Sequence, residues 1–565
     1  MTETLGEVEF ETRTIGTMVL TTPFLRKIGL AEIVDQLCPV GEQAEMGHGV
    51  VAELAVQCRL TEPRALYDME EWAQRYEVAA IYEELGEAKQ LNDDRVGRML
   101  DSIYDKRALI WGEMIGRASQ VYELDMSRLH ADSAPIKFAG LFAEQEDEAA
   151  GVAKLEPGYN PPGEWVPQLK LFAWATGDGK IPVWFEALSG GAGDSPNYVP
   201  QFEAFQEHAQ LATRLPLSEI IVLGDRKMPT AENQLSWLRM GVGYLGPTTM
   251  QPEHRARLAA LLEAEPGWTE LPYVAQREAL KNKAERTLYQ GIGETITLTD
   301  PDPEQAKTYA VRQLYIRSSA LAQREAKSRT AQLSTIETEI KRIQGLVNKY
   351  DYKTPEIVAQ RVQKKAFKKR SAQRYFKFKV LEHPDRPQVP LELTYTIDHD
   401  QISQDTALDG VYLLLAGGAA ADWDDATLLQ EWKGQYKVEH CFRTVNQLFL
   451  VGPLFLKNPR RIISLIFLIM VGALVAGLIE RQIHRALAQR NEPIHGLMPE
   501  GRDHLKPTVS RILHAFSAYS LVQIRDPQGT LLGRHFAKLN AVQQQILDLL
   551  DLPAPVDFFP QPALA

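Results

Sequence analysis

The sequence predicts a multidomain α+β protein whose mixed-sheet core is interrupted by an inserted domain and preceded by a helical domain. Three observations predict this fold class. The chain has 565 residues, which is too many for one hydrophobic core. Its apolar residues recur at helical spacing over residues 16–120 and change to strand-like patterns over residues 122–225. A strand-like run returns at residues 410–416, after a long stretch of different character.

The first part of the chain is expected to be helical. Apolar residues in Val50–Val56 follow helical spacing. An Asn or Asp N-cap residue, among Asn92, Asp93 and Asp94, stands before an amphipathic run. We therefore assign residues 1–121 to a helical N-terminal domain.

Residues 122–245 are expected to form the first part of the core. An Asp-Gly turn between two strand-like runs predicts a hairpin, and the apolar run Ile220–Leu223 is typical of a buried parallel strand. Asp132 would then lie within the first strand of this part, and Asp225 just beyond the last. The other predicted elements are strands at 128–138, 169–175 and 181–188 and a helix at 197–212.

The α/β pattern is interrupted over residues 246–405, which we assign to an inserted domain. The candidates there are strands at 295–298, 310–316 and 391–397 and a long polar helix, or a helical hairpin, at 320–350. Residues 406–492 would form the second part of the core, with a strand at 410–416 and helices at 425–448 and 459–485. Residues 493–565 are expected to be a C-terminal helical tail.

Composition narrows the class of protein. The three cysteines, Cys38, Cys58 and Cys441, are too widely spaced for a disulfide framework or a thiolate metal site, which fits a reducing cytosol. The N-terminal residues lack the basic and apolar segments of a signal peptide. The net charge of −12 taken alone argues mildly against binding to nucleic acid, but the distribution of charge matters more than its sum.

Residues 462–479 contain no charged side chain, and these 18 residues are just long enough to span a membrane. The alternative is a helix buried in a large core. We favour the buried helix, because this is the only such segment and it closely follows the predicted helix that carries Glu439. No membrane partner is therefore expected.

Three acidic residues stand in distinctive contexts, Asp132 and Asp225 in or after strands and Glu439 on a predicted helix. Any one of them alone is better explained as a solvated surface residue. An acid at the centre of a strand, as at Asp132, is costly to bury without a cation or a partner. Three converging carboxylates would suit Mg²⁺, a hard cation that prefers oxygen ligands, and two such ions can assist phosphoryl transfer.

The motifs around these acids resemble those of the DDE transposases of bacterial insertion sequences, in particular the IS-four superfamily and its group named after sequence sixteen-thirty-four. The resemblance covers nearly the whole chain. The motifs that carry it are Leu91–Arg95, Leu129–Ser133, Gly224–Met228 with Glu232 and Asn233, Asp409–Leu413, Tyr436–Arg443 and Leu454–Ile462.

The resemblance implies an RNase H-like core and a metal-dependent nuclease and strand transferase. Asp132, Asp225 and Glu439 would be the catalytic residues and would hold two Mg²⁺ or Mn²⁺ ions. Arg443, one helical turn beyond Glu439, would face the same side and contact a phosphate. The wider superfamily also has Tyr, Arg and Lys around the glutamate. This chain departs from that pattern, and the residues at the corresponding positions are Trp432, Gln435 and Asn446.

The resemblance also implies the partners and the compartment. The partners would be double-stranded DNA, at the transposon ends and in the target, and a second copy of the chain, which would form a homodimer in the synaptic complex. The N-terminal domain would bind the DNA ends. The protein would work in the bacterial cytoplasm in association with the nucleoid.

A basic and aromatic stretch runs from Arg361 to Lys379, with no acid between Glu356 and Glu382. Such a run would bind phosphates irrespective of DNA sequence. Equally, it would be a solvated helix face followed by a strand that buries its aromatic side chains, and the two interpretations are compatible. The DNA-binding candidates in this stretch are Lys364, Lys365, Lys368, Lys369 and Arg370.

Two further signals have simpler explanations. The cluster of Lys457, Arg460 and Arg461 is better explained as a solvated loop than as a phosphate site. His130 would share a strand face with Asp132, and a structural histidine is a better explanation for it than a proton relay.

The sequence therefore predicts a DNA transposase that cuts at insertion-sequence ends and joins the 3′-OH to target DNA. The alternative is a non-catalytic or repurposed DNA-binding protein derived from a transposase, which the departures at Trp432, Gln435 and Asn446 keep open. A third hypothesis is a metal nuclease of the same fold that cuts without joining.

Overall fold

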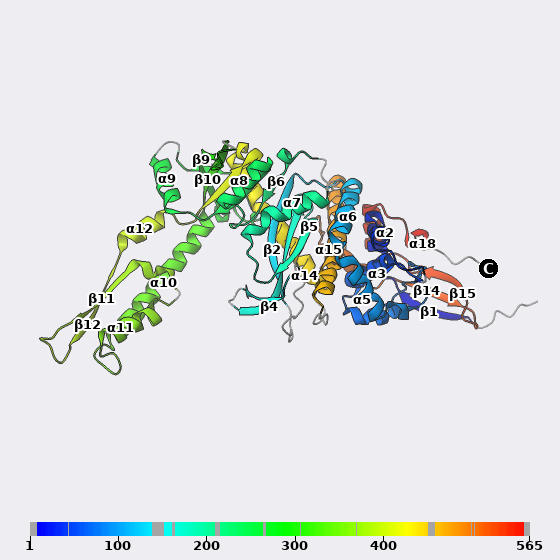
Figure 1. Cartoon of the computed structure of the whole chain (residues 1–565), viewed down its shortest axis with the longest axis horizontal. Coiled ribbons are helices and arrows are strands. Elements are labelled where there is room, and N and C mark those ends of the chain that lie inside the picture. The colour runs from blue at the N-terminus through cyan, green and yellow to red at the C-terminus, as the bar shows by residue number, and fades with distance from the viewer. Residues whose placement is uncertain are drawn as a thin grey trace, which may run out of the picture. The chain divides into compact units, whose positions relative to one another are not determined.

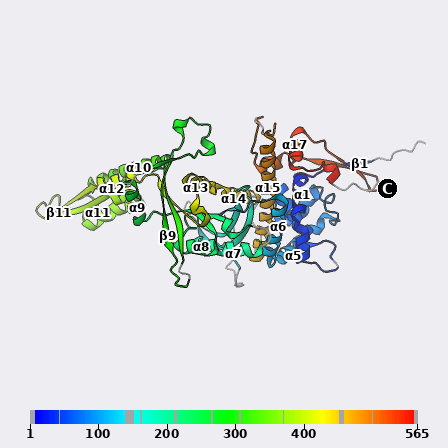
Figure 2. The ribbon, with the colours of Figure 1, turned by 90° about the horizontal axis from the view of Figure 1, so that it is seen from above.

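The computed structural model describes residues 8–42, 44–137, 152–160, 164–209, 215–263, 267–304, 307–368, 370–449, 458–498, 500–501 and 503–558. The chain divides into two compact units, whose elements are shown in Figure 1 and Figure 2. Unit 1 holds Met1–Gly246, Gly418–Ala420 and Trp432–Ala565, and unit 2 holds Pro247–Gly417 and Ala421–Glu431. This mixture of helices and strands in more than one unit agrees with the predicted multidomain α+β class.

Unit 1 begins with one strand and a group of helices, coloured blue in Figure 1. The predicted Asn or Asp N-cap is confirmed and is Asn92, because its side chain accepts a hydrogen bond from the main-chain N–H of Arg95. Gly29, with a φ of 74°, lets the chain turn between the first two helices. These elements are β1 (Glu9–Thr14), α1 (Met18–Ile28), α2 (Leu30–Leu37), α3 (His48–Thr61), η1 (Leu66–Asp68), α4 (Met69–Arg75), η2 (Ala88–Leu91), α5 (Asp93–Tyr104) and α6 (Arg107–Tyr122).

A mixed sheet follows in unit 1. Its strands are β2 (Arg128–Lys137), β3 (Glu156–Asn160), β4 (Glu164–Thr176), β5 (Pro182–Ser189), β6 (Ile221–Leu223) and β7 (Gly243–Thr248). β2 lies between β4, which is antiparallel to it, and β6, which is parallel. β6 is also parallel to β7, and β4 pairs antiparallel with β3 and β5. The predicted strand around Asp132, the hairpin and the buried parallel strand before Asp225 are all confirmed.

Aromatic side chains form the core beside this sheet. Trp174 of β4 is fully buried, and its ring contacts those of Tyr198, Phe202 and Trp237. The helices and turns of this part are η3 (Ser195–Asn197), α7 (Tyr198–His208), η4 (Leu217–Glu219), α8 (Ala231–Met240), η10 (Lys433–Gln435) and α14 (Tyr436–Phe449). α14 contacts β2 and β4, and it thereby brings a segment that is distant in the sequence onto the sheet.

The apolar segment predicted to be a buried helix is part of α15 (Pro459–Arg490). This helix packs against α1, α3, α5, α14 and β5. The ring of Phe467 lies 6.1 Å from that of Trp111 and 6.3 Å from that of Phe185. By length and composition α15 passes the test for a membrane span, but 94% of its most apolar window is buried inside the protein. The prediction of a buried helix is therefore confirmed.

The C-terminal segment is not wholly helical, so this part of the prediction is wrong. It consists of α16 (Val509–His514), β14 (Ser520–Arg525), β15 (Leu531–Phe536), α17 (Ala541–Leu550) and α18 (Pro555–Phe558). β14 pairs antiparallel with β1 and with β15, and this forms a three-stranded sheet. The strand signal was the alternation of buried Leu521 and Gln523 with more exposed neighbours, and this signal is short. The strand gains stability from pairing with the distant β1 as well as with β15.

Unit 2 contains an antiparallel sheet in the order β13–β10–β9–β8, a two-stranded ribbon and a long helix. Its elements are α9 (Pro252–Glu263), β8 (Thr269–Leu271), η5 (Gln276–Glu278), η6 (Lys283–Glu285), β9 (Tyr289–Thr299), β10 (Thr308–Ser318), α10 (Ser319–Gln344), α11 (Pro355–Arg361), η7 (Val362–Ala366), η8 (Ser371–Tyr375), β11 (Phe376–Glu382), β12 (Leu391–Ile397), α12 (His399–Ala407), β13 (Val411–Gly417) and all but the last residue of α13 (Asp425–Trp432). The residues of η9 (Gly418–Asp422), which follows β13, are divided between the two units. Of the two forms expected for the long polar segment, the structure has one continuous helix. β13 pairs with β10 in unit 2. The division into five domains, which assigns this strand to the second part of the core, stays a prediction.

Candidate active site

Asp132 lies in the middle of β2, where it pairs with Ala173 of β4. Its side chain is half-buried, and its Oδ1 accepts a 2.7 Å hydrogen bond from the main-chain N–H of Ser133. The preceding residues His130 and Ala131 are buried. The strand therefore holds this carboxylate at a fixed position on the sheet, with little access to water.

Asp225 lies in the turn that follows the parallel strand β6. Its Oδ1 accepts two hydrogen bonds of 2.9 Å, one from the phenol of Tyr198 and one from the main-chain N–H of Lys227. Gly224 makes the turn possible, because a Cβ at this position would lie 2.8 Å from the Cβ of Met228. The carboxylate is thus oriented by the first residue of α7 and by its own turn.

Glu439 lies in the first turn of α14, and its side chain is exposed. Arg443 is exposed on the same helix, one turn further on, as the sequence predicted. Gln435 joins the start of this helix to β2. Its Nε2 donates a 2.8 Å hydrogen bond to the carbonyl oxygen of Ala131, and its Oε1 lies 3.3 Å from Nδ1 of His130.

His130 is a structural histidine, as we favoured from the sequence. Its side chain is fully buried. Burial and the nearby charge of Lys437 lower the pKa of His130 to about 3, although the hydrogen bond to Gln435 acts in the opposite direction. Gly434 gives the ring room, because a Cβ there would lie 3.2 Å from Cε1 of His130. A ring that stays neutral at physiological pH helps to fix the base of α14 rather than carrying protons.

The three predicted acids lie close enough to influence one another. Burial, together with the charges of Asp225, Asp194 and Glu439, raises the pKa of Asp132 to about 7, despite the hydrogen bond from Ser133. Each of these charges belongs to a different element of unit 1, so the fold gathers carboxylates that are far apart in the sequence. A bound cation would offset their mutual repulsion.

The donor chemistry of this set fits Mg²⁺ or Mn²⁺, because all of its donors are carboxylate oxygens. The side chains are not drawn together into a finished coordination site. In the part of the chain that the structure describes, no group of three His, Cys, Asp or Glu side chains is arranged to hold a metal ion.

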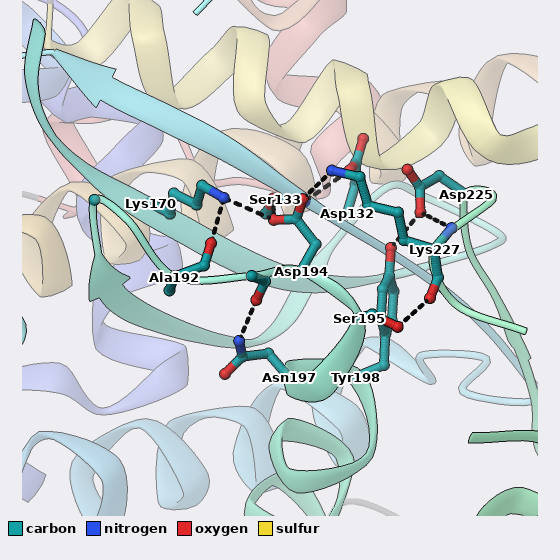
Figure 3. Close-up of polar contacts among 12 residues, drawn as sticks. Asp132, Ser133, Lys170, Ala192, Asp194, Ser195, Asn197, Tyr198, Asp225 and Lys227 are labelled. Atoms are coloured by element: carbon teal, nitrogen blue, oxygen red, sulfur yellow. Dashed lines mark hydrogen bonds and ion pairs between the residues drawn. The ribbon is translucent and has the colours of Figure 1, made fainter. Parts of the chain in front are cut away.

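Asp194 is a fourth acid that the sequence analysis did not select. It lies between β5 and α7 in a Gly-rich turn, and its side chain is buried. It accepts hydrogen bonds from Ser133, Lys170 and Lys227, as Figure 3 shows. Burial alone would raise the pKa of Asp194, but the hydrogen bonds from Lys227 and Ser133 and the charges of the two lysines lower it overall. The only signal in the sequence was the Gly-rich turn itself, which we explained as a simple turn.

The residues that depart from the superfamily pattern have structural settings of their own. Gln435 anchors α14, as described above. The ring of Trp432 lies 4.5 Å from the ammonium of Lys433, in a cation–π contact. Asn446 is exposed on α14, and so is Tyr436, which is 54% exposed.

The basic stretch of unit 2 combines the two interpretations that the sequence left open. The side chains of Lys364, Lys365 and Lys368 are exposed on and just after η7. Arg370 is half-buried and donates to the carbonyl oxygens of Lys365 and Ala366, so it closes the end of the helix. Lys369 lies outside the described residues. The aromatic residues of the stretch belong to a buried cluster with α10, and they are Phe367, Tyr375, Phe376 and, at its edge, Phe378.

The second basic cluster makes contacts within unit 1. Arg461 forms two hydrogen bonds with the carboxylate of Asp101, of 2.8 and 2.7 Å. The guanidinium of Arg460 lies 5.1 Å from the ring centroid of Tyr104. Lys457, with the first part of the motif Leu454–Ile462, lies outside the described residues.

Residues 10–109 match a protein-family model described as a domain of unknown function, DUF4277. This match runs from β1 to the start of α6, so the carboxylates of the candidate site lie outside it. No curated protein matches the chain.

Among solved structures, the chain is similar to a piggyBac transposase synaptic complex with hairpin DNA, with 8% sequence identity, a TM-score of 0.35 and coverage of 89% of this chain and 78% of that chain. It is also similar to a Mos1 transposase paired-end complex with the left transposon end, with 14% identity, a TM-score of 0.14 and coverage of 36% and 58%. For a pre-cleavage Mos1 transpososome the identity is 11%, the TM-score 0.14 and the coverage 36% and 59%.

Proposed function

We propose that the chain is a metal-dependent DNA transposase of the DDE type, with an RNase H-like core in unit 1. The observation that carries the proposal is the setting of Asp132. This half-buried carboxylate lies on the central strand β2 and is surrounded by the charges of Asp225 and Glu439 from two other elements. Concentrating negative charge at a half-buried position destabilises the folded chain unless the charges serve to bind cations.

Asp132, Asp225 and Glu439 would hold two Mg²⁺ or Mn²⁺ ions. When bound, such ions stabilise the charge on the attacking and leaving oxygens of an in-line displacement. The exposed guanidinium of Arg443, one turn beyond Glu439, would bind a phosphate oxygen of the DNA. Tyr198 would keep the carboxylate of Asp225 in its orientation through the observed 2.9 Å hydrogen bond.

The reaction would consist of two displacements at phosphorus. In the first, the oxygen of a water molecule bonds to phosphorus at the end of the element and the P–O3′ bond breaks; one water proton passes to the leaving O3′, which becomes the 3′-OH, and the other passes to solvent. In the second, the freed 3′-OH bonds to phosphorus in the target, the P–O3′ bond there breaks, and the hydroxyl proton passes to the leaving oxygen. Each step exchanges one P–O bond for another, so no covalent bond between protein and DNA is required.

The DNA partner would be double-stranded, at the element ends and in the target. The exposed side chains of Lys364, Lys365 and Lys368 provide a positively charged face in unit 2. Phosphate contacts from this face would give affinity that does not depend on DNA sequence. We further propose that the N-terminal helices bind the element ends, that two copies of the chain pair the ends, and that the protein works in the bacterial cytoplasm with the nucleoid.

A second candidate function is DNA binding without catalysis, in a protein derived from a transposase. Two observations favour it. The described carboxylates do not form a finished metal site. At the position where the superfamily has an arginine, Gln435 is engaged with β2 instead of facing DNA.

The experiment that separates these functions is cleavage of a labelled duplex carrying one end of the DNA element that encodes the chain, in Mg²⁺. Asp132→Ala, Asp225→Ala and Glu439→Ala should each abolish cleavage and leave DNA binding largely intact. Glu203→Ala, which removes an exposed acid from α7, is the matched control and should cleave normally. Near-normal cleavage by any of the three variants would show that the assignment is wrong. Binding without cleavage by the unaltered protein would favour the second function.

A further inference from the structure

Asp194 connects the strand of Asp132 to the turn of Asp225. Its Oδ1 accepts a 2.5 Å hydrogen bond from Oγ of Ser133 and a 3.3 Å hydrogen bond from Nζ of Lys170. Its Oδ2 pairs with Nζ of Lys227. Both oxygens are therefore occupied by donors, and Asp194 serves as an acceptor that holds neighbouring groups in place.

Lys227 is fixed at its main chain as well as at its ammonium group. Its N–H donates to Asp225, and its carbonyl oxygen accepts a 2.8 Å hydrogen bond from Oγ of Ser195. Asn233 donates to the carbonyl oxygens of Ser195 and Met228, with a distance of 2.9 Å in each case. It thereby joins the turn that contains Asp194 to the turn that contains Asp225. Figure 3 shows Lys227 reaching from the Asp225 turn to Asp194.

The ammonium of Lys227 remains accessible, because its side chain is 57% exposed whereas that of Asp194 is 9% exposed. An ammonium group has three N–H donors, and the contact with Asp194 uses one of them. An ordinary exposed lysine is mobile and loses side-chain entropy when it binds a ligand. Here the buried Asp194 already restricts the side chain of Lys227, which lies beside two of the proposed catalytic carboxylates, Asp132 and Asp225.

A phosphodiester approaching Asp132, Asp225 and Glu439 would be repelled by their negative charges. A cation held at the edge of this cluster would reduce the repulsion and orient the phosphate. Lysine is well suited to this task, because it binds phosphate as a point charge. Donors that are fixed before the reaction stabilise developing charge without having to reorganise.

On the basis of the proposed transposase function, we propose that Lys227 binds a non-bridging oxygen of the phosphodiester to be cut, and that Asp194 is the positioning residue that holds Lys227. Lys227 would contact the DNA, and Asp194 would act through Lys227. The competing role for Lys227 is that of a counter-cation that only neutralises the carboxylates in the absence of metal.

The test uses the full-length protein and the variants Lys227→Met, Lys227→Arg and Asp194→Asn. Arg226→Met removes the adjacent exposed charge and is the matched control. Cleavage is measured on a labelled duplex with one element end, Mn²⁺ affinity by direct titration without DNA, and DNA affinity as a function of salt with Ca²⁺ in place of Mg²⁺.

Removal of one preorganised donor lowers a rate by about 10²–10³-fold, so we expect a loss of this size for Lys227→Met. We also expect a smaller loss for Lys227→Arg and a loss of at least about tenfold for Asp194→Asn, since a surrounding hydrogen-bond partner typically contributes about 10–100-fold. The slope of log affinity against log salt should fall by about 0.9 for Lys227→Met, which corresponds to one lost phosphate contact. Mn²⁺ affinity should be unchanged or higher. If Lys227 had a purely structural role, Lys227→Met would leave the salt slope unchanged, and Lys227→Arg would not cleave better than Lys227→Met.

Three outcomes would overturn the proposal. Normal cleavage by Lys227→Met with a higher Mn²⁺ affinity would show that Lys227 is only a counter-cation. Equal losses for Lys227→Met and Arg226→Met would show a general effect of charge. If the unaltered protein neither cleaved the duplex nor bound Mn²⁺, the proposed function itself would fail and this role with it. Cleavage by the unaltered protein and by Lys227→Met alike would leave the proposed function standing.

Discussion

The side-chain amide of Gln435 donates a 2.8 Å hydrogen bond to the carbonyl oxygen of Ala131, the residue before Asp132. The same amide lies 3.3 Å from the ring of His130. Gln435 immediately precedes α14, which carries Glu439, so this side chain helps to hold the start of that helix on β2. A residue that looks like a departure from a sequence pattern thus has a defined part in building the site.

Replacing Gln435 with Met, which has a similar shape but no amide, should disturb the distance between Glu439 and Asp132. We expect a loss of about 1–2 kcal/mol in the free energy of unfolding, because a buried acceptor loses its donor. Affinity for Mn²⁺ should fall by about tenfold, the lower end of the effect of supporting residues around metal ligands. Chemical denaturation and Mn²⁺ titration measure the two effects. Asn446→Ala, an exposed change on the same helix, is the control, and equal metal affinity in both variants would argue against an anchoring role.

Tyr198→Phe should weaken metal binding while preserving the fold. The variant removes the phenol that donates a 2.9 Å hydrogen bond to Asp225 and retains the ring that packs on Phe172 and Trp174. Supporting hydrogen bonds of this kind typically contribute about 10–100-fold to metal affinity. Tyr244→Phe is a close control, since Tyr244 is also buried and donates 2.8 Å to Gln234, away from the acids. A similar Mn²⁺ affinity in the two variants would show that the phenol of Tyr198 does not orient Asp225.

The sequence predicted the elements that carry the three acids because their signals are local. The alternation around Asp132, the apolar run before Asp225 and the helical spacing around Glu439 each lie within one segment, and β2, β6 and α14 form there. The N-cap at Asn92 was predictable for the same reason.

The rest of the site depends on contacts between distant parts of the chain. Asp194 follows glycines in a turn, and nothing near it in the sequence indicates that Lys170 and Lys227 will meet its carboxylate. Gln435 and Ala131 are hydrogen-bonded in the structure, but most of the sequence of the core lies between them. In the same way, one of the two partners of β14 is β1 from the opposite end of the chain, and the C-terminal sequence alone does not indicate this contact.

Asp132→Asn should stabilise the metal-free protein at high pH and have little effect at low pH. Folding raises the pKa of Asp132 from 3.8 to about 7, mainly by burial. Between these pH values the folded protein binds more protons than the unfolded chain, so the stability due to Asp132 falls as the pH rises. Asparagine stays neutral and lacks this loss. We expect an increase in the free energy of unfolding on the order of 2 kcal/mol at pH 8 and a small difference at pH 4, both in EDTA. A difference that did not change with pH would mean that burial does not raise the pKa of Asp132.

The exposed lysines of unit 2 offer a test of DNA binding that does not depend on catalysis. The triple variant Lys364→Gln, Lys365→Gln and Lys368→Gln removes three charges that project from η7 and the residues after it, without touching the buried aromatic cluster. If each lysine contacts one phosphate, the slope of log affinity against log salt should become shallower by about 0.9 per lysine. Because these contacts carry no sequence information, affinity for random duplexes should fall by the same factor as affinity for element ends.

The matched control replaces Lys283, Lys307 and Lys349, which are also exposed in unit 2, with glutamine. Equal effects of the two triple variants would assign the binding to overall charge rather than to this face.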